Sequence, residues 1–152
     1  MPEFSTRRRV QHSAANMFAL VADVEGYPEF VPLCKSLKVR RRTTENGREV
    51  IVADMTIAYK VVSETFTSRV TLERERLTIL VEYIEGPFRR MNNRWTFRPV
   101  DDKSCEVEFF LTYEFRSRTL GLLMGSVFDA AFRRFATAFE RRADQVYGTR
   151  VA

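Results

Sequence analysis

The spacing of the apolar residues changes once along the chain, from a period of two to a helical period. Between residues 50 and 115, apolar and polar residues alternate in several short runs, as in strands with one dry face and one wet face. From Leu120 to Tyr147 the spacing becomes helical, and about 28 residues at 1.5 Å each give a helix of roughly 42 Å. The pattern therefore predicts an antiparallel meander followed by one long amphipathic helix.

The segments before the meander complete the expected fold. Residues 3–10 are predicted to form a first strand, and Ser13 can cap a short helix. Asn46-Gly47 is a strong hairpin signal, and Gly148 is expected to end the long helix. This order predicts one α+β domain over residues 1–152, with about six antiparallel strands after the first. Because a sheet of this width curls, a long helix lying across it leaves a hollow.

Several residues on the inward faces of the meander are polar. A buried polar group without a partner costs about 1–3 kcal/mol, so each one either finds a local partner, lies at the open rim or faces a ligand. Small-molecule sites are usually apolar with a few such polar groups. The predicted ligand-binding residues are Met55, Ile57, Tyr59, Glu64, Phe66, Ser68, Val81, Tyr83, Asn93, Trp95, Phe109, Leu111, Tyr113, Val127, Phe128 and Phe132.

The segment Tyr27–Pro32 contains prolines and aromatic residues and precedes the first hairpin. Its aromatic side chains look exposed and stand beside basic residues, which predicts a lid or a lip that touches a membrane. The alternative is that the aromatics plug the core. The predicted members of the lip are Tyr27, Pro28, Phe30, Val31, Pro32, Lys35 and Arg40.

No catalytic or metal-binding set is visible in the sequence. His12 is the single histidine, so a histidine-based zinc site cannot form, and the common nucleotide-binding and nucleophile motifs are absent. We therefore expect no enzyme, no metal and no cofactor. Cys34 and Cys105 are too few for a disulfide framework. No apolar run reaches the roughly 20 residues of a membrane span, and the beginning lacks an apolar signal core, so we expect a cytoplasmic protein.

The formal net charge is +5, and much of the excess lies in short arginine runs. Such a surface favours anionic partners, either phospholipid headgroups or nucleic acid. The alternative is an ordinary solvated surface in which arginines alternate with Glu and Asp. Charge alone does not separate these interpretations.

Several segments together resemble the coenzyme Q-binding START-domain family of the polyketide-cyclase/START-like superfamily. The most specific is Val24–Pro32 with Cys34 just after it. The others are 64–70, Gly86-Pro87-Phe88 leading to Trp95-Thr96-Phe97, and the closing helix with Phe128, Phe132, Phe135 and Phe139. The resemblance covers nearly the whole chain.

The resemblance implies a helix-grip fold, in which an antiparallel sheet grips the long helix over a hydrophobic tunnel. It also implies non-enzymatic binding of ubiquinone or another polyprenyl lipid, as a carrier or chaperone that supports respiration. The expected ligand is therefore hydrophobic, and a peripheral contact with an anionic membrane, at its inner face, is a further expectation. The wider superfamily also holds aromatase/cyclases and hydrolases, but no acid–base pair here supports one.

The same family includes ribosome-association toxins, which act on the large ribosomal subunit. This is the alternative function, and DNA is not an expected partner under either interpretation. The arginines that could bind ribosomal RNA or protein are Arg7, Arg8, Arg9, Arg40, Arg41, Arg42, Arg133 and Arg134.

Overall fold

The alternating residues form one seven-stranded antiparallel sheet in the computed structural model, which describes residues 3–148. The strand order is β1-β7-β6-β5-β4-β3-β2, so the first strand pairs beside the last and the others follow as a meander. This confirms the predicted α+β class. The strands are β1 (Glu3–Val10), β2 (Cys34–Glu45), β3 (Arg48–Tyr59), β4 (Val62–Glu73), β5 (Thr78–Glu85), β6 (Phe88–Asp101) and β7 (Ser104–Phe115).

Three helical elements accompany the sheet: α1 (Ala14–Ala22), a 3-10 helix η1 (Val24–Glu29) and the long α2 (Arg118–Tyr147). The predicted cap Ser13 accepts a hydrogen bond from the Asn16 backbone N–H at 3.1 Å. Ser117 caps α2 in the same way, so this helix begins two residues before the apolar spacing shows it. Gly148 ends α2 at φ 88°, as predicted.

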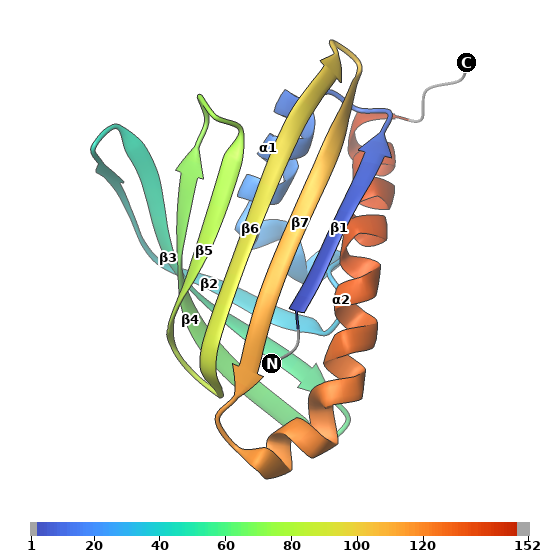
Figure 1. Cartoon of the computed structure of the whole chain (residues 1–152). Helices are drawn as coiled ribbons and strands as arrows, with labels where there is room; N and C mark the ends of the chain where they lie inside the picture. The colour runs from blue at the N-terminus through green and yellow to red at the C-terminus, as the bar shows by residue number, and fades with distance from the viewer. Residues whose placement is uncertain (1–2, 149–152) are drawn as a thin grey trace.

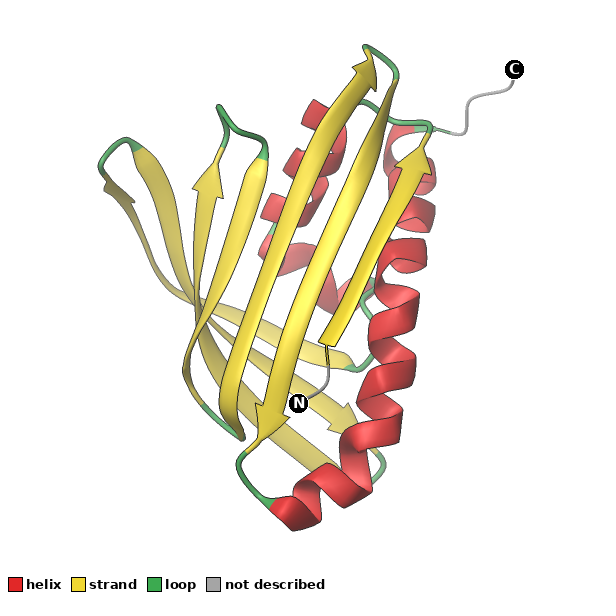
Figure 2. Cartoon of the chain, in the orientation of Figure 1, coloured by secondary structure: helices red, strands yellow, loops and turns green. Residues whose placement is uncertain are grey.

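The sheet curls around the helices (Figure 1). α1 contacts β5, β6 and β7, whereas α2 rises along β7 and β1 (Figure 2). The core fills the space between the concave face of the sheet and these helices. Within residues 3–148 no helix is both long and apolar enough to cross a bilayer.

Strand register places the predicted inward residues on one face. Met55 pairs with Phe66, and Val81 lies between Val70 and Asn93 in one cross-strand row. Since directly paired residues share a face of the sheet, these side chains all point to the concave side. The hairpin at Asn46-Gly47 sets the register of β2 against β3 with φ 54° and 77°, the left-handed conformations of a type I′ turn.

Candidate ligand-binding cavity

A cavity of about 100 Å³ lies between the concave face of the sheet, η1 and α2. Its wall is almost wholly apolar and rich in aromatic rings. For comparison, an engineered apolar cavity of about 150 Å³ in another protein takes up benzene. The cavity as it stands therefore has room for about one ring, and a longer ligand would need α2 or η1 to move.

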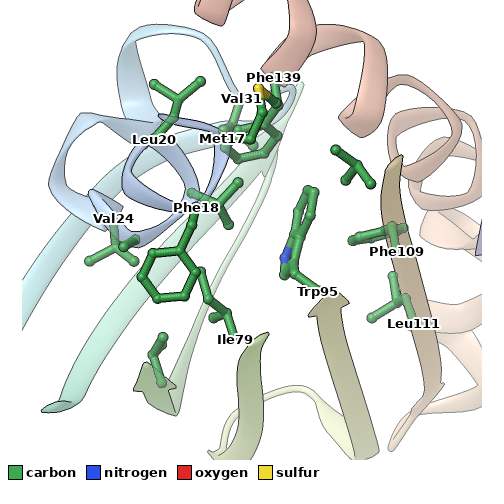
Figure 3. Packing of buried hydrophobic residues seen from close by; sticks show 14 of the residues in the cluster. Met17, Phe18, Leu20, Val24, Val31, Ile79, Trp95, Phe109, Leu111 and Phe139 are labelled. Atoms are coloured by element: carbon green, nitrogen blue, oxygen red, sulfur yellow. The ribbon is translucent and has the colours of Figure 1, made fainter. Parts of the chain in front are cut away.

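Trp95 forms the centre of the wall. Its side chain is 3% exposed and projects from β6 between Phe18 and Phe109 (Figure 3). The ring centroid lies 4.7 Å from that of Phe109 and 4.9 Å from that of Phe139, both edge-on. Edge-to-face rings hold their mutual orientation, so the wall is stiff where these three meet.

Two polar side chains, Ser68 and Asn93, interrupt the apolar lining. Ser68 is 6% exposed, and its hydroxyl oxygen has no hydrogen-bond partner. The Asn93 amide donates from Nδ2 to the Phe110 carbonyl at 2.8 Å, which fixes its orientation. An unsatisfied buried hydroxyl costs free energy until a ligand supplies a partner. The cavity therefore favours an apolar ligand with one hydrogen-bonding oxygen.

Tyr27 is the one ionisable side chain among the described residues of the wall. Its hydroxyl donates to the Val21 carbonyl. Burial raises the pKa of Tyr27 above its ordinary value, and repulsion from Cys34, once its thiol is ionised, and from Asp23 adds to the shift. The phenol is thus neutral and already bonded, which leaves it poorly suited to accept or deliver a proton.

The structure places most of the predicted ligand-binding residues against this cavity. They come from five of the seven strands and from α2, and they meet there because the curl of the sheet brings distant strands together. These residues are Met55, Ile57, Phe66, Ser68, Val81, Asn93, Trp95, Phe109, Leu111, Phe128 and Phe132.

Three other predicted residues lie away from it. Tyr59 lies at the end of β3 and is 39% exposed, so the expectation that it lines the cavity is wrong: the strand ends before this side chain is covered. Glu64 pairs with Ile57 but sits near the start of β4, half-buried, at the rim. Val127 packs against the core beside Phe128 without reaching the cavity.

Two tyrosines serve the packing around the cavity instead. The Tyr83 hydroxyl accepts a hydrogen bond from the Phe88 backbone N–H at 3.0 Å, which ties it to the β5–β6 turn. Tyr113 is buried under α2, with its ring 5.2 Å from Phe132, and burial raises its pKa, as does nearby Asp129. Both face inward as expected, but neither belongs to the cavity wall, and each packs instead against Phe88, which does.

The segment Tyr27–Pro32 does not form an exposed lip. Tyr27, Val31 and Pro32 line the cavity, and Phe30 packs edge-on to Phe139 at 4.9 Å. The aromatics are held by α2, so the expectation that they lie exposed is wrong and the alternative of a core plug describes their packing.

The remaining predicted lip residues differ in environment. Pro28 is half-buried within η1, and Lys35 is exposed. Arg40 is paired, with Nε 2.8 Å from Asp54, and is therefore not a free cation. Although partial burial of Asp54 acts in the opposite direction, hydrogen bonds from Thr67 and Arg40 hold its pKa below the usual range.

Ten lining residues were missing from the prediction. Ala53 and Val70 belong to inward sets that the sequence already showed, and Phe135 and Phe139 continue the helical spacing of Phe128 and Phe132, so the signal existed. Leu33 has φ 67°, and Phe88 lies at a β-bulge, so simple alternation cannot place them. The missed residues are Val24, Leu33, Leu37, Ala53, Val70, Phe88, Met91, Ala131, Phe135 and Phe139.

His12 and the cysteines lie outside the cavity wall. The His12 Nε2 atom is 2.6 Å from Asp144 Oδ1, a carboxylate that the sequence did not suggest, and this pair joins α2 to the segment before α1. Burial raises the pKa of Cys34 and of Cys105 to about 11 each, so both are unreactive thiols at neutral pH. Among residues 3–148 no cluster of three His, Cys, Asp or Glu could hold a metal ion.

A long helix gripped by a curled antiparallel sheet over an apolar cavity defines the START-like, helix-grip class of fold. The chain belongs to the family described as polyketide cyclase / dehydrase and lipid transport, whose model matches residues 10–140. The chain is similar to an 18 kDa protein from Caulobacter crescentus (28% identity, TM-score 0.78, 98% of this chain and 100% of that one). It is also similar to a START superfamily protein from Mycobacterium smegmatis (21%, TM-score 0.79, 95% and 98%).

The chain is also similar to named relatives of two kinds. The ribosome association toxin RatA of Escherichia coli is 34% identical over 150 residues, covering 99% of this chain and 92% of the relative. RatA of Vibrio cholerae is 36% identical over 148 residues, covering 97% and 99%. The mitochondrial coenzyme Q-binding protein coq10 of Schizosaccharomyces pombe is 26% identical over 141 residues, covering 92% and 85%.

The packing of Phe30 gives a direct test of plug against lid. Phe30→Ser is expected to lower the free energy of unfolding by about 1.5–3 kcal/mol. The change removes a half-buried ring together with its edge-on contact with Phe139 and its cation–π contact with Arg142. Val61→Ser is the matched control, since Val61 is 99% exposed and its change should stay within about 0.5 kcal/mol. Urea unfolding measures both. Equal stability of the two variants would contradict the plug.

Proposed function

We propose that this protein binds, without catalysis, a hydrophobic molecule that carries a ring and a hydrogen-bonding oxygen, most specifically a quinone with an isoprenoid tail. The observation that carries the proposal is the unpartnered Ser68 hydroxyl in an otherwise apolar, ring-lined cavity. A quinone carbonyl would accept its hydrogen bond while the ring packs among aromatic side chains. The name of the coq10 relative supports the same ligand class.

The size of the cavity limits how such a ligand would be held. About 100 Å³ suits the ring, so the tail would leave along α2 or displace it. Each tail methylene that becomes buried would contribute about 0.8 kcal/mol, and a few isoprene units would suffice for micromolar binding. A protein of this kind would act as a carrier or chaperone for respiratory quinone, in the cytoplasm and at the membrane surface.

The absence of acid–base chemistry in the cavity supports a binding role. The described wall offers one hydroxyl, one amide and a neutral, already bonded phenol. General acid–base catalysis needs a group that can exchange a proton near neutral pH, and none of these three does so readily. We infer that the cavity binds its ligand and leaves it unchanged.

The single tryptophan makes this proposal measurable. Because Trp95 lines the cavity, its fluorescence should be quenched by a ubiquinone analogue with a saturated ten-carbon tail. Ser68→Ala should weaken binding of that quinone about five- to tenfold, by removing one hydrogen bond. It should leave the affinity for decylbenzene, measured by displacement of the quinone, unchanged. The same variant should unfold no more easily than the wild type, since it also removes an unsatisfied buried hydroxyl.

Ser63→Ala is the matched control, because Ser63 is exposed on the same strand. It should leave the affinity for both compounds unchanged. If Ser68→Ala bound the quinone as tightly as the wild type did, the hydroxyl would not recognise the ligand. If the quinone did not quench Trp95, or if decylbenzene did not displace it, the cavity would not be the site.

The second candidate is association with the large ribosomal subunit. It is favoured by the two RatA relatives, which match nearly their whole length at 34% and 36% identity. Ion pairs reduce the number of arginines that are free to bind RNA. Five of the proposed arginines are each paired with a carboxylate: Arg7, Arg8, Arg40, Arg42 and Arg133. Of the arginines proposed for this role, those without an ion pair among residues 3–148 are Arg9, Arg41 and Arg134.

Co-sedimentation with ribosomal subunits tests this candidate. Binding through free arginines should fall steeply between low and moderate salt. Replacing Arg9, Arg41 and Arg134 with Gln should lower the salt slope by about one for each phosphate that is no longer neutralised. Arg48→Gln is the control, because Arg48 pairs with Glu73 at 3.2 Å. No co-migration with the large subunit at low salt would remove this candidate.

A further inference from the structure

The end of the molecule at which α2 begins exposes large apolar side chains. Leu122 and Leu123, in the first turns of α2, are 81% and 61% exposed, and Val61 in the β3–β4 turn is 99% exposed. Tyr59 and Ile84 add partly exposed apolar surface at the same end. Single exposed apolar residues are ordinary, but a group of them at one end indicates a contact surface.

Connectivity puts these residues at the same end. In an antiparallel meander alternate connections lie at the same end of the sheet. The β3–β4 turn, the β5–β6 turn and the link from β7 to α2 therefore all lie at one end. The Arg116 backbone N–H donates to the Pro87 carbonyl at 2.8 Å, which joins the link to the β5–β6 turn. Figure 1 shows the β3–β4 turn and the beginning of α2 at this lower end.

Unpaired positive charge surrounds the apolar residues. Lys60, Arg116 and Arg118 are exposed and make no ion pair within the part of the chain that the structure describes. The nearby carboxylate of Glu114 already pairs with Arg90 at 3.4 Å. This contrasts with the edge strands, where carboxylates neutralise most arginines.

Two glycines allow the first turns of α2 to bend. A side-chain carbon added at Gly125 would meet nothing within 4 Å, and one at Gly121 would make only ordinary contact with Phe115 at 3.7 Å. Packing therefore does not require either glycine, although each weakens a helix. Figure 1 shows these turns inclined to the rest of α2. Phe115 stacks on the cavity residue Phe128 at 5.2 Å, so movement here reaches the cavity wall.

We propose that this end of the molecule is a docking surface for an anionic phospholipid bilayer. Val61, Leu122 and Leu123 enter the headgroup layer, while Lys60, Arg116 and Arg118 bind lipid phosphates. A second copy of the chain fits this surface less well, because a two-fold contact would bring the unpaired cations against one another. The surface differs from the lip expected at Tyr27–Pro32.

Vesicle flotation with the full chain tests the surface. The wild type should bind vesicles of phosphatidylcholine containing about a third phosphatidylglycerol, and bind pure phosphatidylcholine weakly. The double variant Leu122→Ser with Leu123→Ser should bind these anionic vesicles at least about tenfold more weakly than the wild type. The double variant Arg116→Glu with Arg118→Glu should also lose about tenfold or more in vesicle affinity, and its remaining binding should depend less on salt.

Matched controls come from the opposite end. Val146→Ser and Lys103→Glu remove an exposed apolar group and an exposed cation there, and should bind vesicles like the wild type. All variants should melt within a few degrees of the wild type, because every changed side chain is exposed. Without vesicles the leucine variant should still show quinone quenching of Trp95, which separates this surface from the cavity.

Three results would overturn the proposal. The first is wild-type vesicle binding by the leucine variant, and the second is equal binding to neutral and anionic vesicles. The third is a wild-type dimer in light scattering that the leucine variant converts to a monomer, since the patch would then be a contact between copies. None of these outcomes bears on quinone binding in the cavity.

Discussion

The contact between the phenylalanine stripe of α2 and the aromatic residues of the sheet determines the rest of the structure. Phe128, Phe135 and Phe139 meet Phe88, Phe109 and Trp95, with ring centroids at 6.0, 6.1 and 4.9 Å. These large rings hold the helix away from the curled sheet, and the space that they leave between helix and sheet is the cavity. The same interaction thus fixes the helix and creates the cavity.

Many charged side chains of the surface are arranged in ion pairs. The two longest arginine runs, residues 7–9 and 40–42, lie along the edge strands β1 and β2, where neighbouring Glu and Asp residues face most of them. Exposed pairs of this kind contribute little to stability, about 0–1 kcal/mol each, but they remove free positive charge from the surface. The cations that remain unpaired therefore say more about anionic partners than the net charge of +5 does.

The fold could be predicted from the sequence because alternation and helical spacing are direct consequences of backbone geometry. The same rules placed Phe66, Trp95 and Phe128 against the cavity. They failed at Tyr59, where a strand ends before its side chain is covered, and at Leu33, whose positive φ has no simple sequence signal.

The prediction of an exposed lip at Tyr27–Pro32 was wrong for a different reason. Its exposure depended on whether α2 reaches it, and the contact between Phe30 and Phe139, more than a hundred residues apart, is not visible in a local pattern. Exposure of Leu123 was hidden in the same way, since helical spacing assigns it to the apolar face of the helix without showing that the sheet leaves it uncovered.

The central claim is that the cavity holds a hydrophobic ring in the cell. Organic extraction of the purified chain, produced in a host that makes quinones, tests it most directly when the wild type is compared with Ala131→Phe. Ala131 is 6% exposed and lines the cavity, so the added ring fills the space without reaching the surface. Quinone or a comparable lipid is expected in the wild-type extract, and little in the extract of the folded variant. Equal lipid in both extracts, or none from repeated wild-type preparations, would contradict the claim.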